Sequence, residues 1–94
     1  MNLSDKVKFL SNNRELYQYL LFWAAALKKR NLGDLSEAVV SASRQASGSS
    51  TEFLGESRIV FRRVLKEDRK VLTAQERDDL SDILRQLDEA LDKR

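Results

Sequence analysis

Carboxylates are the residues of this sequence whose spacing comes closest to catalytic or metal-binding chemistry. Asp78 with Asp82 and Asp88 with Asp92 are two pairs at i, i+4 spacing, and such pairs can perform acid–base work or hold a hard cation. Both pairs fall on the side of their predicted helix away from its leucine residues, where water keeps them ionised. We therefore expect neither a catalytic nor a metal role for them.

The sequence contains no histidine and no cysteine. It thus lacks an imidazole general base, an imidazole or thiolate metal ligand, a thiolate nucleophile and a disulfide. Two of the commonest routes to enzyme catalysis are closed. We predict a protein that is not an enzyme and that uses no metal ion or other cofactor.

A stripe of basic residues is the second candidate site. Four basic side chains share one face of a predicted helix: Arg58, Arg62, Lys66 and Arg69. Such a stripe can track nucleic-acid phosphates. In an antiparallel pair with the following helix, however, Asp78, Asp79 and Asp82 would lie near Arg62, Arg63 and Lys66. The net charge is only +2, so nucleic-acid binding is the alternative function rather than the first.

The most apolar run of the chain is Leu16–Leu27, which Lys28 ends at once. It is shorter than the roughly 17–25 residues that a bilayer-spanning helix needs. The small residues Ala24–Ala26 fit the cleavage pattern of a signal peptide, but Glu15 directly before the run argues against one. We predict a buried helix in a cytoplasmic protein without membrane contact.

Helical periodicity predicts four helices after a lead-in segment of residues 1–12, at about 13–30, 35–46, 50–69 and 74–91. Three helix starts resemble capping boxes: Asn12 with Glu15, Ser49 with Glu52, and Thr73 with Glu76. Gly33 is expected to end the helix at 13–30, and Asp34 to cap the helix at 35–46. Gly48 is expected to end the helix at 35–46.

The connections between these helices are short, which favours antiparallel neighbours. The predicted fold is all-α: one domain over residues 1–94, folded as an antiparallel four-helix bundle. A three-helix core with a shorter fourth helix is the alternative.

The helix predicted at 13–30 is apolar nearly all round, although a helix of a small bundle normally hides one face. Phe22 and Ala26 lie towards the side opposite its main stripe, and Tyr19 widens that stripe. Phe22, flanked by Tyr19 and Ala26, is the centre of the predicted partner interface. Either residues 1–12 cover this side, or a partner does. The sequence therefore predicts an interaction module that binds another protein or a second copy of itself, with a homodimer as the first choice.

Overall fold

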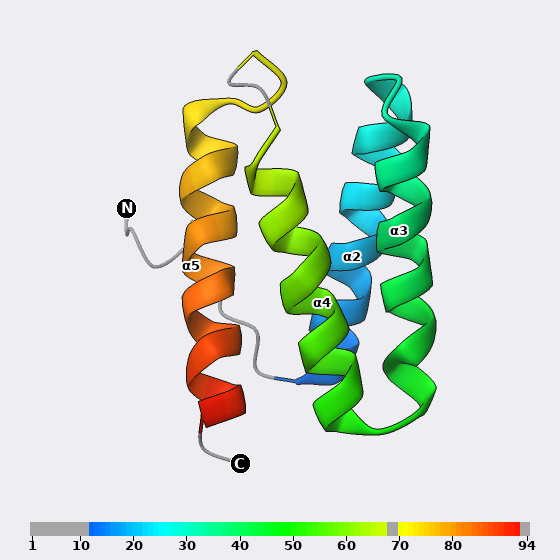
Figure 1. The fold of residues 1–94 in the computed structure, drawn as a ribbon, viewed down its shortest axis with the longest axis vertical. Coiled ribbons are helices and arrows are strands. Elements are labelled where there is room, and N and C mark those ends of the chain that lie inside the picture. Colours follow the sequence, from blue (N-terminus) through cyan, green and yellow to red (C-terminus); the bar gives the residue numbers. More distant parts are fainter. Residues whose placement is uncertain (1–11, 68–69, 93–94) are drawn as a thin grey trace.

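The computed structural model describes residues 12–67 and 70–92, and this part of the chain is helical without strands. It consists of α2 (Asn13–Lys29), α3 (Gly33–Ser43), the 3₁₀ helix η1 (Arg44–Ser47), α4 (Ser50–Leu65) and α5 (Ala74–Asp92). The α-helices run alternately up and down, with α4 between α3 and α5 and with α2 behind them (Figure 1). The predicted antiparallel four-helix bundle is confirmed. Apart from Asn12, the predicted lead-in segment lies outside the described residues.

Local sequence signals fix where three of the helices begin. In each, the backbone N–H three residues after the cap donates to the capping side chain: Glu15 to Asn12 (2.9 Å), Glu52 to Ser49 (3.4 Å) and Glu76 to Thr73 (3.0 Å). At Thr73 the box is reciprocal, since the carboxylate of Glu76 accepts from the Thr73 N–H at 2.9 Å. These three predicted caps are confirmed.

The end of α2 corrects the prediction for Gly33. Asn31 takes up the left-handed conformation there, with φ 65°, and Gly33 has no positive φ. The N–H of Leu32 donates to the carbonyl of Leu27 (3.0 Å), and that of Asn31 to the carbonyl of Lys28 (3.1 Å). This bonding pattern is a Schellman motif, for which asparagine is the commonest substitute for glycine. Asn31, rather than Gly33, therefore turns the chain out of α2.

The start of α3 corrects the prediction for Asp34. The helix begins at Gly33, its N-cap is Leu32, and no side chain caps it. Asp34 lies in the first turn instead, where its negative charge interacts favourably with the positive end of the helix dipole. The helix also ends earlier than predicted, at Ser43, because the chain tightens into η1 before Gly48 caps that short element.

Side chains from all four α-helices form one buried apolar cluster. The largest fully buried residues include Trp23, Phe53, Phe61, Leu80 and Ile83. Two buried serines are satisfied by backbone carbonyls: Ser36 donates to Ala24 (2.7 Å) and thereby ties α3 to α2, while Ser57 donates to Phe53 (2.8 Å). These buried contacts hold the helices together and so fix the positions of their outward faces.

Candidate interaction surface on helix α2

Helix α2 buries one side and exposes the other. Its buried side chains recur at helical spacing: Leu16, Leu20, Trp23, Ala24 and Leu27. None of the helices in the described ranges is both long and apolar enough to cross a bilayer. The apolar run of the sequence is thus a core helix on one side and an apolar surface on the other.

The structure places the three predicted interface residues on one flank of α2. Phe22 is 59% exposed, whereas Tyr19 and Ala26 are half-buried against the core. The Tyr19 ring stacks on Phe22 with centroids 6.2 Å apart and tilts against Phe61 of α4 at 5.5 Å. Phe22 also meets Trp23 edge to face at 6.0 Å. The exposed ring of Phe22 therefore packs against two aromatic side chains, Tyr19 and Trp23.

Burial raises the pKa of Tyr19 to about 12, from an ordinary 10.0. The neighbouring indole of Trp23 opposes part of this increase in pKa, and the carboxylates of Asp79 and Glu76 on α5 add to it. Among the buried side-chain nitrogen and oxygen atoms of the described residues, the indole Nε1 of Trp23 is the one without a hydrogen-bond partner.

Sequence reasoning missed a second apolar flank of α2. Tyr17 and Leu21 are 38% and 40% exposed and line an open groove of about 610 Å³ together with Val40, Arg14 and Arg44. The signal was present in the sequence, because a helix that is apolar all round must expose apolar side chains on both edges of its buried stripe.

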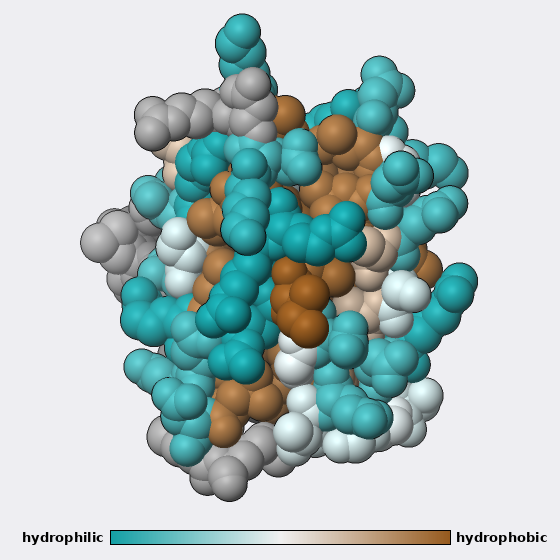
Figure 2. All heavy atoms as spheres, in the orientation of Figure 1, coloured by the Kyte–Doolittle hydropathy of each residue, from teal (hydrophilic) through white to brown (hydrophobic). Residues whose placement is uncertain are grey.

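The face of the molecule in Figure 2 differs from this surface. Hydrophilic side chains lie along the helices of that face, and apolar surface shows mainly between them (Figure 2). Outside α2, the large exposed apolar residue of the described chain is Ile59 on α4, which is 52% exposed. Exposed apolar side chains are therefore concentrated on α2.

Comparison of the chain with protein-family models, curated proteins and solved structures finds no match.

Two residues of the predicted basic stripe form ion pairs within the molecule. Arg58 and Arg62 both contact the same carboxylate oxygen of Asp88, at 3.0 and 3.2 Å. Lys66 is exposed, and Arg69 lies outside the described residues. The structure thus brings two of the four cations together, on an acidic residue of α5.

The acidic residues that were expected to lie near the basic stripe have other partners. Asp82 pairs with Arg85 of its own helix at 2.8 Å, and Asp79 accepts a hydrogen bond from Gln75 at 2.9 Å. Helices α4 and α5 run antiparallel as predicted, but among the described residues the ion pairs of Arg58 and Arg62 are with Asp88 and not with these two carboxylates. Within the described ranges, no three acidic side chains come together as a metal-binding group.

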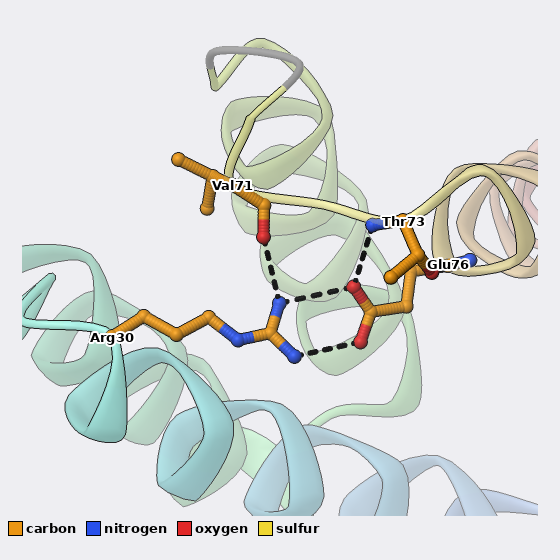
Figure 3. A network of polar contacts seen from close by, with 4 residues as sticks. All are labelled: Arg30, Val71, Thr73 and Glu76. Atoms are coloured by element: carbon orange, nitrogen blue, oxygen red, sulfur yellow. Dashed lines mark hydrogen bonds and ion pairs between the residues drawn. The ribbon is translucent and has the colours of Figure 1, made fainter.

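A network of polar contacts lies at one end of α2 (Figure 3). The Arg30 guanidinium lies 5.7 Å from the centre of the Trp23 ring and donates to the carbonyl of Val71 at 3.0 Å. Its other contact is the carboxylate of Glu76. Every charge in the network has an intramolecular partner, so the network stabilises the fold and is not a site for a ligand.

Proposed function

We propose that this protein is a non-enzymatic helical interaction module that self-associates through α2. The observation that carries the proposal is the exposure of Phe22, 59%, directly beside the fully buried Trp23. A phenylalanine can bury on the order of 150 Å² or more when a second surface covers it. Tyr17 and Leu21 on the second flank of α2 add to its exposed apolar area, and exposed apolar surface of this kind marks protein–protein contacts.

The support beneath Phe22 strengthens the proposal. Its ring stacks on Tyr19 and abuts Trp23, so its position is set before any partner arrives. A side chain that is already ordered loses little conformational entropy on binding, and more of the apolar burial then contributes to affinity. An interface centred on Phe22 would therefore use a pre-organised anchor.

The other parts of the proposal come from the sequence. No metal, cofactor or catalytic role is proposed, because the chain has no histidine or cysteine. A cytoplasmic location is proposed because cleavage within Ala24–Ala26 would remove Leu16, Leu20 and Trp23 from the core. The sequence also allowed residues 1–12 to cover this surface, but apart from Asn12 these residues lie outside the described part of the chain. The experiment below distinguishes such covering from self-association.

Sedimentation velocity up to high micromolar concentration tests the proposal. We expect the wild-type protein to dimerise as concentration rises, and Phe22→Glu to remain monomeric at the same concentrations. Ile59→Glu is the matched control, since it places the same charge at a similarly exposed apolar residue of another helix, and it should dimerise like the wild type.

Two results would contradict self-association through α2. One is a wild-type protein that stays monomeric throughout. The other is a Phe22→Glu variant that dimerises as well as Ile59→Glu. A monomeric wild type in which Phe22→Glu also lowers the free energy of unfolding by more than about 1 kcal/mol would show that the chain itself covers Phe22.

Nucleic-acid binding through the basic stripe has less support. Arg58 and Arg62 would have to leave Asp88 before both could contact phosphates, which would cost part of the binding free energy. Nucleic-acid binding is therefore the alternative function, and the salt dependence of DNA binding tests it.

A further inference from the structure

The outward side of α2 carries a seam with the spacing of a two-stranded coiled coil. Its residues follow one another at three and four positions: Glu15, Gln18, Phe22, Ala25 and Lys29. At about 100° per residue they fall within about 40° of one line along the helix. Gln18, Phe22, Ala25 and Lys29 are exposed. Apolar residues at this spacing interlock with those of a second helix in a coiled coil, and the apolar residues of this seam are Phe22 and Ala25 at its middle.

The charges at the two ends of this seam are opposite. Glu15 lies in the first turn of α2, and Lys28 and Lys29 lie in the last turn. Glu15 and Lys29 are each one heptad away from Phe22. If a second α2 packs antiparallel with Phe22 at the crossing point, Glu15 of each copy therefore meets Lys29 of the other. A parallel pairing would instead bring the two copies of Lys29 together.

We infer that the seam binds the same helix of a second copy, antiparallel, with the two-fold axis at Phe22. This inference rests on the proposed self-association and specifies its geometry. The pairing is isologous, as closed dimers require, and the opposed helix dipoles favour it as well.

The size of the seam predicts a weak dimer. A 17-residue helix is about 26 Å long, and one such face is smaller than the roughly 800 Å² per partner of a stable interface. The flanking Tyr17 and Leu21 enlarge the buried area. We therefore expect the dimer to form only in the high micromolar range.

Disulfide cross-linking tests the orientation, because the natural chain has no cysteine. Glu15→Cys and Lys29→Cys are prepared separately, mixed in equal amounts and oxidised under native conditions, and the products are counted by mass spectrometry. The antiparallel pairing predicts severalfold more mixed dimer than either same-variant dimer. This mixed dimer keeps the other Glu15–Lys29 contact intact, so the variants do not remove the feature under test. The same mixture oxidised in urea supplies the statistical ratio.

Charge reversal gives a second measurement. Glu15→Lys should weaken dimerisation severalfold, and adding Lys29→Glu to the same chain should restore it, because each antiparallel contact then has opposite charges again. Three results would overturn the antiparallel pairing in a wild type that still dimerises. Same-variant cross-links could dominate, the cross-linking could be statistical, or the double variant could fail to restore dimerisation. A wild type that stays monomeric would instead overturn the proposed self-association and this inference together.

Discussion

The guanidinium of Arg30 and the carboxylate of Glu76 face each other in a two-point contact, with N–O distances of 3.0 and 2.7 Å. Arg30 ends α2 and Glu76 lies in the first turn of α5, so the contact joins two helices that are distant in the sequence. Glu76 also accepts the N–H of Thr73 (2.9 Å). One carboxylate thus caps its own helix and fastens that helix to another.

Replacing Glu76 by alanine should therefore remove two interactions at once. The capping interaction contributes about 1 kcal/mol, and the partly exposed ion pair, with side chains 32% and 21% exposed, adds up to about 1 kcal/mol. Urea denaturation should show a loss of roughly 1–2 kcal/mol for Glu76→Ala. Asp78→Ala, an exposed carboxylate in the same region of α5, should cost less than about 0.5 kcal/mol. Equal losses for the two variants would show that the Arg30 contact contributes nothing.

The same contact should make stability depend on pH in the acid range. The hydrogen bonds from Arg30, and then the Thr73 N–H, hold the pKa of Glu76 below its ordinary 4.5. A carboxyl group whose pKa is lowered by folding contributes stability above the unfolded-state pKa, and this contribution is lost as pH falls through the folded-state pKa. The difference in unfolding free energy between wild type and Glu76→Gln should hence be constant near neutrality and shrink below about pH 4.5. A difference that stays the same down to pH 3 would contradict the ionic contact.

How well the sequence predicted these features depends on how local their causes are. The box of Thr73 and Glu76 involves residues three positions apart, so the residue types alone predicted it. The contact between Glu76 and Arg30 depends on where α2 and α5 pack, which no local pattern encodes. The acidic residues expected near Arg62 were wrong for the same reason. The short connection predicted antiparallel helices, but the packing of α5 against α4 decides that Asp88 is the carboxylate in contact with Arg62.

At the candidate interaction surface, too, local features were predicted and features that depend on helix packing were not. The periodicity of Leu16, Leu20 and Trp23 indicates which side of α2 is buried, and Phe22 was predicted correctly to lie away from it. Tyr17 and Leu21 lie at the edge of the buried stripe, where a small rotation of the helix decides between core and solvent. The all-round apolarity of the helix indicated that some apolar side chains would be exposed, but the spacing did not decide that Tyr17 and Leu21 would be among them.

Tyr19 should stay protonated to unusually high pH. In a Tyr17→Phe variant it is the remaining tyrosine, and the absorbance of its phenolate should rise with a midpoint at about pH 12, returning to about 10 in urea. Because folding raises this pKa, the stability that the neutral phenol contributes is present below about pH 10 and is lost as pH rises toward 12. Circular dichroism at each pH establishes that the helices are intact. A midpoint near 10 in the folded protein would contradict the burial of Tyr19 beneath Phe22.

The alternative function predicts salt-dependent binding to nucleic acid. Because Asp88 occupies Arg58 and Arg62, we expect the wild-type protein to leave the fluorescence anisotropy of a labelled DNA duplex unchanged at about 50 mM salt. Binding that weakens steeply with salt, and that the double variant Arg58→Ala and Arg62→Ala abolishes, would favour the nucleic-acid function over self-association. Arg85→Ala is the control, since it removes an exposed arginine that pairs within α5.

Asn31 and Gly33 should respond to substitution in a way that the sequence alone does not suggest. Asn31 has a φ of 65°, a conformation in which glycine is less strained than any other residue. Asn31→Gly should therefore raise the free energy of unfolding by about 0.5–1 kcal/mol, and Asn31→Ala should lower it by about 1 kcal/mol.

Gly33 has no positive φ and an added Cβ there would meet no atom within 4 Å, so Gly33→Ala should stabilise the protein by about 0.4–1 kcal/mol. Thermal and urea denaturation of the three variants measure these changes. If Gly33→Ala destabilised the protein and Asn31→Ala did not, the left-handed residue at the end of α2 would be Gly33, and the Schellman motif at Asn31 would be wrong.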